Sequence, residues 1–281
     1  MAKTIVFIDG RQVDYRRATV SVFDYTLHCG IGLFESILGV EDRLILLNEH
    51  LDRMEQGIER LGLETLNYDR KKISRTLHRA VKLHPEKIMK VKVFLTQGGS
   101  HLWPGNKPKP KMIVMVTGHR LQYKKQRLIV TPMIITADNV LQGTKTLNYM
   151  TEWMSQRKAE EAGYDQGIII NAKGHITETG SSNIFIAKND KLFTPPLSSG
   201  CLPGITRDEI MRLAKEMKIR CHEKHLTPDD LAHADEIFTS SSFKIIWPVV
   251  ELKSKRTHKY QTGPISKVLF DCMKKNFLQS C

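Results

Sequence analysis

Two side chains stand in surroundings that could give them a chemical role. Lys145 lies between two threonines with no neighbouring charge, so burial could remove its water and leave its amine nucleophilic. Glu178 follows Ile176 by two residues, and the alternation of a strand would turn both inward. A buried carboxylate then needs a cationic or hydrogen-bonding partner. The alternatives are an ordinary surface lysine and a turn after Thr177.

Two further segments could bind an anion. In residues 204–209, Thr206 and Glu209 have the spacing of a capping box, in which the threonine caps a helix. Free N–H groups at a helix start also bind phosphate, and Gly204 would let an anion approach the backbone. Residues 239–242 place hydroxyls after a strand, where they would bind an anion or form a serine-rich turn.

The elements that position these residues alternate between strands and helices. The pattern predicts a mixed α/β (α+β) chain without the regular rhythm of a doubly wound sheet. We expect strands at residues 44–47, 91–95, 112–116, 128–135, 168–170, 184–187, 191–194 and 236–239. We expect helices over residues 48–62 with Asn48 as the cap, 70–83, 148–162 and 206–217, and near the C-terminus.

The chain is expected to form two domains. Residues 1–118 would form an N-terminal α/β domain, residues 119–126 a polar linker, and residues 127–281 a C-terminal α/β domain that carries Lys145. The glycine- and proline-rich loop of residues 98–110 would form a pocket edge or a dimer contact, or be an ordinary surface loop.

Composition excludes several classes of protein. The 281 residues are 41% hydrophobic, which is enough for a real core and excludes a disordered chain or a collagen. The apolar runs are too short for a membrane span, and the N-terminus reads as a strand rather than a signal peptide. Five scattered cysteines without metal-ligand spacing favour a reducing compartment, the cytoplasm.

The net charge of +13 raises the alternative of a nucleic-acid-binding protein. The basic residues form short clusters without interleaved aromatics, and no zinc-finger or basic-zipper pattern is present. We therefore prefer a solvated basic surface or an anionic small-molecule ligand.

Several segments, in order along nearly the whole chain, resemble the fold-type IV pyridoxal-phosphate enzymes. This class IV aminotransferase family includes branched-chain and D-amino acid aminotransferases, (R)-selective amine transaminases and aminodeoxychorismate lyases. The matching segments are residues 27–30 (LHCG) through Phe34-Glu35, 48–53 (NEHLDR), 145–148 (KTLN), 177–185 (TETGSSNIF), 193–196 (FTPP), 202–207 (LPGITR), and 235–238 (DEIF) to 248–249 (PV). The resemblance implies a two-domain, D-amino acid aminotransferase-like fold and a homodimer.

The resemblance also implies roles for individual residues. Lys145 would hold pyridoxal 5'-phosphate as a Schiff base and later carry the proton between substrate Cα and cofactor C4′. Glu178 would keep the pyridine nitrogen protonated, and Leu202 would pack on the ring. The phosphate would be bound by Arg53, Ile205, Thr206 and Ser242, and Gly204 and Ser241 would also belong to the cofactor site. Ser182 and Asn183 would orient this shell.

The candidate substrate residues are Phe34, Tyr149, Lys90, His101 and Phe243, with Trp103 as a further pocket wall. The D-amino acid enzymes bind the substrate carboxylate with an Arg-x-His pair, but residues 98–103 contain a histidine and no arginine. The branched-chain enzymes use an arginine on the preceding strand, where Lys90 is the nearest candidate. Lysine cannot bind a carboxylate as a planar fork.

The resulting prediction is a pyridoxal-phosphate-dependent aminotransferase. It would move an amino group between a branched-chain-like or D-amino acid and a 2-oxo acid such as 2-oxoglutarate or pyruvate. The alternative is an aminodeoxychorismate lyase that releases 4-aminobenzoate and pyruvate. That reading is kept open by Ser36, which stands where lyases often carry a threonine.

Overall fold

The computed structural model describes residues 3–63, 68–99 and 109–279, which form two compact units. Unit 1 comprises Met1–Leu121 and Thr144–Tyr149, and unit 2 comprises Gln122–Gly143 and Met150–Cys281. The expected C-terminal domain included residues 144–149, but the structure groups them with unit 1. The reason is that their backbone bonds to a strand of that unit, as described below.

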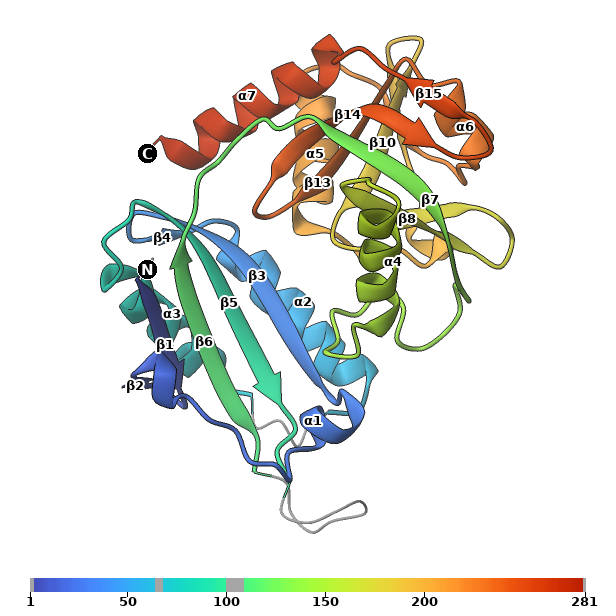
Figure 1. The fold of residues 1–281 in the computed structure, drawn as a ribbon. Helices are drawn as coiled ribbons and strands as arrows, with labels where there is room; N and C mark the ends of the chain where they lie inside the picture. The colour runs from blue at the N-terminus through green and yellow to red at the C-terminus, as the bar shows by residue number, and fades with distance from the viewer. Residues whose placement is uncertain (1–2, 64–67, 100–108, 280–281) are drawn as a thin grey trace. The chain divides into compact units, whose positions relative to one another are not determined.

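Unit 1 is a six-stranded antiparallel sheet with two helices on one face (Figure 1). The strand order is β2-β1-β6-β5-β3-β4. The elements are β1 (Thr4–Ile8), β2 (Arg11–Val13), α1 (Tyr25–Cys29), β3 (Gly32–Val40), β4 (Arg43–Leu44), α2 (Leu47–Arg60), α3 (Arg70–Lys82), β5 (Ile88–Thr96) and β6 (Lys111–Gly118).

Side-chain alternation on β5 separates the two faces of this sheet. Met89, Val91, Val93 and Leu95 are buried in the core that α2 and α3 cover. The intervening residues, Lys90, Lys92 and Phe94, are only partly buried and lie on the opposite face. Strand β3 pairs with β5 from Gly32 to Val40 and is buried at every position except Ser36, so both of its faces are covered.

Unit 2 is a mixed nine-stranded sheet. Its order is β12-β11-β10-β13-β14-β7-β8-β9, with β15 paired to β14. The elements are β7 (Gln126–Ile135), α4 (Met150–Glu161), β8 (Gln166–Asn171), β9 (Ile176–Thr179), β10 (Asn183–Lys188), β11 (Lys191–Thr194), α5 (Ile205–Glu216), β12 (Cys221–Glu223), α6 (Pro228–Ala232), β13 (Glu236–Ser241), β14 (Ile245–Lys253), β15 (Thr257–Lys259) and α7 (Pro264–Leu278).

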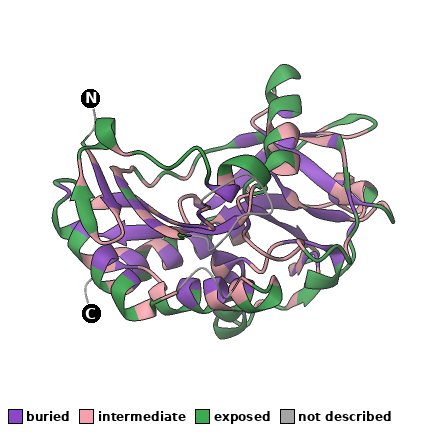
Figure 2. Ribbon diagram, turned by 90° about the horizontal axis from the view of Figure 1, so that it is seen from below, coloured by how far each residue is buried: buried purple, intermediate pink, exposed green. Residues whose placement is uncertain are grey.

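The strands of unit 2 provide its core, and the helices pack around them. Helix α4 contacts β7 and β8, whereas α5 and α7 contact β13. Buried residues gather on the strands, and exposed ones lie on the outer helix faces and loops (Figure 2). The mixed α+β architecture in two parts confirms the predicted fold class.

Two predicted helix caps are wrong. Helix α2 begins at Leu47 and is preceded by Leu46 in the left-handed region (φ 53°), while the Asn48 side chain accepts a hydrogen bond from Arg70. The strand expected over residues 44–47 is correspondingly short. Helix α5 has Gly204 rather than Thr206 as its N-cap, because the Gly204 carbonyl already accepts the first intrahelical bond, from Asp208 N (2.9 Å).

The Glu178 carboxylate belongs to a strand and not to a turn, since β9 continues to Thr179. Among the described residues, no helix is both long and apolar enough to cross a membrane. Of the glycine- and proline-rich loop, residues 100–108 lie outside the described residues, so the predictions for His101 and Trp103 fall there.

Candidate active site

The segment that carries Lys145 is held along the edge of β3. Phe34 N donates a hydrogen bond to Lys145 O (3.0 Å), and Leu147 N donates one to Gly32 O (2.9 Å). Thr146 pairs with Leu33 as an antiparallel bridge. Backbone bonds on both sides therefore fix the main chain of Lys145, and its side chain starts from a defined point.

Phe34 is the aromatic neighbour of the Lys145 amine. Lys145 Nζ lies 4.3 Å from the centroid of the Phe34 ring, a cation–π distance. The Tyr149 ring meets the same ring edge-on at 5.6 Å, and Phe94 stacks on it at 6.0 Å. Phe34 is only 8% exposed, so one side of the amine faces a buried apolar ring.

A second lysine, Lys92, approaches the same ring. Its Nζ lies 5.9 Å from the Phe34 centroid, and β5 places it on the same face as Lys90. Burial, together with the charge of Lys90, lowers the pKa of Lys92. The sequence prediction named Lys90, which pairs with Leu38, whereas Lys92 pairs with Ser36, nearer to Phe34. The alternation of buried and partly buried residues along β5 could have identified Lys92 from the sequence.

Arg53 lies on the other side of β3, in a buried ion-pair cluster. Its Nε and Nη2 donate to the two oxygens of Glu35, at 2.8 and 2.7 Å. His50 Nδ1 donates to Glu35 Oε2 at 2.7 Å. Burial raises the pKa of Glu35, but the Arg53 charge and the two hydrogen-bonding partners outweigh it and hold that pKa far below its usual range. Sequence reasoning assigned Arg53 a role but gave none to Glu35 or His50.

In unit 2, Glu178 and Asn183 clamp the backbone of Leu202. Leu202 N donates to Glu178 Oε1 (2.9 Å), and Asn183 Nδ2 donates to Leu202 O (2.9 Å). The Asn183 amide also lies 3.5 Å from Glu178 Oε2. These bonds fix the Glu178 carboxylate and the Leu202 main chain relative to each other.

The start of α5 lies against the same clamp. A Cβ at position 204 would overlap Asn183 Oδ1, so any residue other than glycine would force the Asn183 side chain to move. The helix has no side-chain cap, and therefore its first N–H groups are directed outward from a start held by Gly204. This end of α5 has the donors of an anion site, with Thr206 buried in its first turn.

The turn of residues 241–244 carries backbone strain. Lys244 N donates to Ser241 O (3.2 Å), which closes the turn that contains Ser242 and Phe243. The next residue, Ile245, is fully buried with φ 56°, a costly conformation for a β-branched residue. Next to the turn, Ser240 Oγ is buried and has no hydrogen-bond partner among the described residues. Strain of this kind is typical of binding sites.

The Ser182 hydroxyl belongs to a polar hydrogen-bond network that includes Lys244 of this turn. This hydroxyl lies 3.4 Å from Gln166 Oε1 and accepts a bond from Lys244 Nζ (3.2 Å). Lys244 Nζ also donates to Gln166 Oε1 and Ser181 Oγ. The network ties the 241–244 turn to the turn after β9, so Ser182 orients the backbone here.

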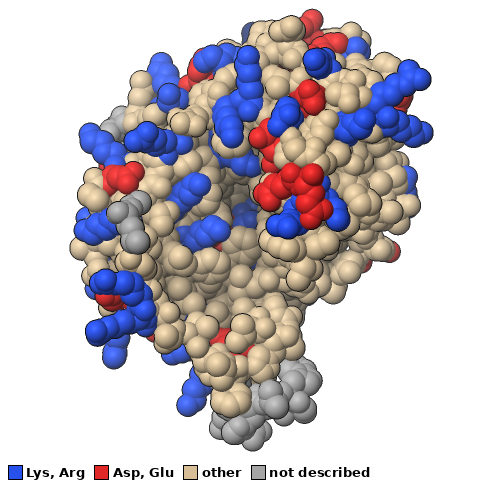
Figure 3. All heavy atoms as spheres, in the orientation of Figure 1, with Lys and Arg blue, Asp and Glu red and all other residues tan. Residues whose placement is uncertain are grey.

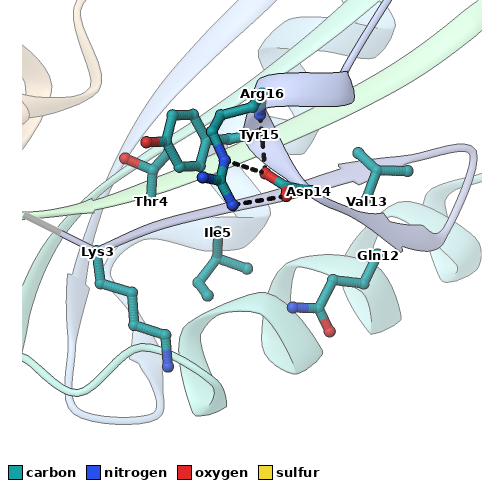
Figure 4. A pocket seen from close by; sticks show the side chains of 8 residues that line it. All are labelled: Lys3, Thr4, Ile5, Gln12, Val13, Asp14, Tyr15 and Arg16. Atoms are coloured by element: carbon teal, nitrogen blue, oxygen red, sulfur yellow. Dashed lines mark hydrogen bonds and ion pairs between the residues drawn. The ribbon is translucent and has the colours of Figure 1, made fainter.

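Two other surface features lack the chemistry of a reaction site. A shallow hollow of about 370 Å³ lies beside β1 and β2, where Asp14 and Arg16 form an ion pair with each other (Figure 4). Lysine and arginine side chains are scattered over the face shown in Figure 3 rather than gathered into one stripe. In the described part of the chain, no group of three or more metal-ligating side chains occurs.

Comparison with known proteins identifies the family. Residues 32–252 match the family model for amino-transferase class IV. The chain is 31% identical over 269 residues to a Methanocaldococcus jannaschii protein named "Putative branched-chain-amino-acid aminotransferase", covering 94% of this chain and 93% of that protein. It is 27% identical to a D-alanine aminotransferase of Bacillus licheniformis, with 93% of each chain covered.

The fold agrees with a solved structure. The crystal structure of a branched-chain aminotransferase from Thermoproteus uzoniensis with norvaline superposes with a TM-score of 0.89 at 26% identity. The alignment covers 98% of this chain and 94% of that one. The chain therefore belongs to the class IV aminotransferases and is a pyridoxal-phosphate-dependent enzyme of their α+β fold.

Proposed function

We propose that this enzyme transfers the amino group of a branched-chain-like or D-amino acid to a 2-oxo acid such as 2-oxoglutarate or pyruvate. The observation that carries the proposal is the Lys145 amine, 4.3 Å from the buried Phe34 ring on a segment bonded to β3. The names of the relatives from Methanocaldococcus jannaschii and Bacillus licheniformis support the two donor classes.

The residues present fit the cofactor. Pyridoxal phosphate has an aldehyde, a pyridine nitrogen and a phosphate, and when bound it supplies an electron sink for the substrate carbanion. Lys145 offers an amine for the aldehyde, and Glu178 a fixed carboxylate for the nitrogen. Within the described part of the chain, the start of α5 has no side-chain cap and the buried Ser240 hydroxyl has no hydrogen-bond partner; together with Gly204 these features suit a phosphate.

Each residue then has a defined role. Lys145 binds the cofactor and afterwards moves the proton at the substrate Cα. Glu178 keeps the ring nitrogen protonated, and its bond from Leu202 N holds the carboxylate in place. Leu202 would cover one face of the ring, and Asn183 fixes the Leu202 carbonyl. Ile205, Thr206, Ser242 and Arg53 would bind the phosphate, and Ser241 would also belong to the cofactor site.

Lys92 is proposed to bind the substrate carboxylate, with Lys90 as a second positive charge. Both amines lie on the face of β5 that carries Phe94, and Lys92 approaches the ring that also contacts Lys145. Phe34 and Tyr149 offer an apolar wall for a branched side chain. Phe243, in the 241–244 turn, is a further candidate wall.

We propose a cytoplasmic homodimer. Unit 1 exposes Val20, Val22, Phe23 and Leu27 within one short segment, and clustered exposed apolar side chains are typical of protein–protein contacts. The four cysteines within the described residues are free, which suits a reducing compartment. Light scattering of the purified protein checks the dimer, and a monomer mass would refute it.

One experiment separates the proposed reaction from the lyase alternative. The holoenzyme is mixed with one amino donor at a time, from a panel of both enantiomers, and the cofactor absorbance is followed. Stoichiometric conversion of the cofactor to its amine form supports transamination. Release of pyruvate from aminodeoxychorismate without this conversion would overturn it.

The role of Lys145 is tested with a matched pair of variants. Lys145→Ala is expected to abolish the conversion and the visible colour of the bound cofactor. Lys173→Ala removes an exposed lysine from a turn and is expected to leave both unchanged. A coloured, active Lys145→Ala enzyme would refute the assignment.

A further inference from the structure

The cluster of Glu35, His50 and Arg53 contains more buried charge than core packing needs. Glu35 is 1% exposed, His50 2% and Arg53 8%. An ion pair buried to this degree rarely stabilises a fold more than apolar side chains of the same size would. A function for the guanidinium explains why such a cluster is present.

The geometry of the cluster fixes the plane of the guanidinium. Glu35 accepts from Nε and Nη2, one edge of the planar fork, through two bonds of 2.8 and 2.7 Å. His50 donates from Nδ1 to Glu35 Oε2, because a carboxylate oxygen can only accept. A planar group held along one edge by two hydrogen bonds keeps its plane, so the orientation of the rest of the guanidinium is restricted as well.

We propose that Glu35 and His50 are positioning residues that aim the Arg53 guanidinium at the cofactor phosphate. This inference rests on the proposed function, in which Arg53 binds that phosphate. Glu35 sets the direction of the fork and balances its charge in the dry interior, and His50 holds the second oxygen of Glu35. The three residues together determine how strongly the protein prefers a phosphorylated pyridoxal.

The electrostatics agree with this arrangement. Burial lowers the pKa of His50, and the positive charges of Arg53 and Lys145 act in the same direction, against the contrary effect of Glu35. His50 therefore serves as a neutral donor at neutral pH. Glu35 offsets the charge of Arg53, so the effect of the cluster on an incoming dianion depends on how the guanidinium N–H groups are oriented.

The test measures the affinity of the apoprotein for two ligands that differ only in the phosphate. Pyridoxal 5'-phosphate and pyridoxal are each titrated into apoprotein, and binding is followed by tryptophan fluorescence. Glu35→Gln keeps the shape but loses the charge and one acceptor. We expect its affinity for pyridoxal phosphate to fall about 10- to 100-fold, as loss of a charge-assisted bond implies. Its affinity for pyridoxal is expected to change less than about threefold.

A pair of variants at His50 covers the case in which Glu35→Gln does not fold. His50→Asn keeps a donor near the Nδ1 position, and we expect it to retain the preference for the phosphate. His50→Leu removes the donor, and we expect the preference to fall. Glu236→Gln is the matched control, because Glu236 is a buried carboxylate that accepts from Ile265 N and Ser266 N at the start of α7.

The outcomes separate this inference from the proposed function. A purely structural role of Glu35 would lower both affinities equally, as we expect for Glu236→Gln, and would overturn the inference. If Arg53→Ala lowers the preference for the phosphate but Glu35→Gln and His50→Leu do not, the inference fails and the proposed role of Arg53 stands. If Arg53→Ala leaves the preference unchanged, both fail.

Discussion

Gly204→Ala provides the sharpest test of how unit 2 prepares its half of the site. Gly204 has φ −75° and ψ 125°, which any residue adopts, so the substitution causes no backbone strain. The added methyl group would instead overlap Asn183 Oδ1. Asn183 is 6% exposed and has little room, so its amide must turn away and release the Leu202 carbonyl.

The size of the effect follows from what is lost. Freeing the 2.9 Å bond between Asn183 Nδ2 and Leu202 O leaves two buried polar groups unsatisfied, which costs about 1–3 kcal/mol. Overpacking a well-filled site costs a further 1–3 kcal/mol. A loss of about 3 kcal/mol lowers the Tm of a domain of this size by about 6–12 °C. The Leu202 main chain also loses one of its two fixed bonds, which loosens the partner of Glu178.

Calorimetry and cofactor titration measure the two consequences. We expect Gly204→Ala to show the lower Tm and at least tenfold weaker binding of pyridoxal phosphate. Gly174→Ala is the control, because its added methyl group meets open space and causes only the strain of φ 77°. It should lower the Tm slightly without changing the affinity. Wild-type affinity and Tm in Gly204→Ala would refute the argument from the clash.

Three further predictions follow from single side chains. Lys92→Met should raise the KM for the amino donor about tenfold with a smaller change in kcat. An equal or larger rise in KM for Lys90→Met would contradict the proposal that Lys92 is the main ligand of the substrate carboxylate. Because Arg53 and His50 outweigh burial and keep Glu35 ionised in the folded state, the unfolded chain takes up a proton first as the pH falls below about 4.5. Stability is therefore present above that pH and lost below it, by up to about 1.4 kcal/mol per pH unit, and Glu35→Gln should flatten this slope in urea unfolding between about pH 5 and 3. Burial, aided by the charge of Glu178, raises the pKa of Cys201 to about 12. We therefore expect iodoacetamide to label the exposed Cys29 and not Cys201, as measured by peptide mapping. Labelling of Cys201 in the folded protein would refute this prediction.

Local patterns predicted most of the elements. Helix α3 was expected over residues 70–83 and spans Arg70–Lys82, because its apolar residues recur at helical spacing. The expected strand at residues 128–135 lies within β7, and that at 184–187 within β10. Helix α3 buries one face and β10 is buried along almost its whole length, and both patterns are visible in the sequence without any knowledge of tertiary contacts.

Helix starts and site partners depend on contacts distant in sequence. Asn48 does not cap α2 because Arg70, 22 residues away, takes its side chain. The family resemblance predicted roles for Lys145 and Arg53. The local sequence, however, could not show that the segment that carries Lys145 pairs with β3. Nor could it show that Glu35 meets Arg53, 18 residues along the chain. Such pairings are set by the register of strands and by helix packing, which no local window contains.

The order of Phe34 and Glu35 along β3 decides which chemistry lies on which face of the sheet. As consecutive strand residues they point in opposite directions, Phe34 toward the Lys145 amine and Glu35 toward Arg53 on α2. A slip of one residue in the pairing with β5 would exchange them. It would place a carboxylate beside the amine and leave a buried guanidinium without its partner. The nine paired positions from Gly32 to Val40 make that slip costly, so the register of one strand keeps the amine and the guanidinium each in its own surroundings.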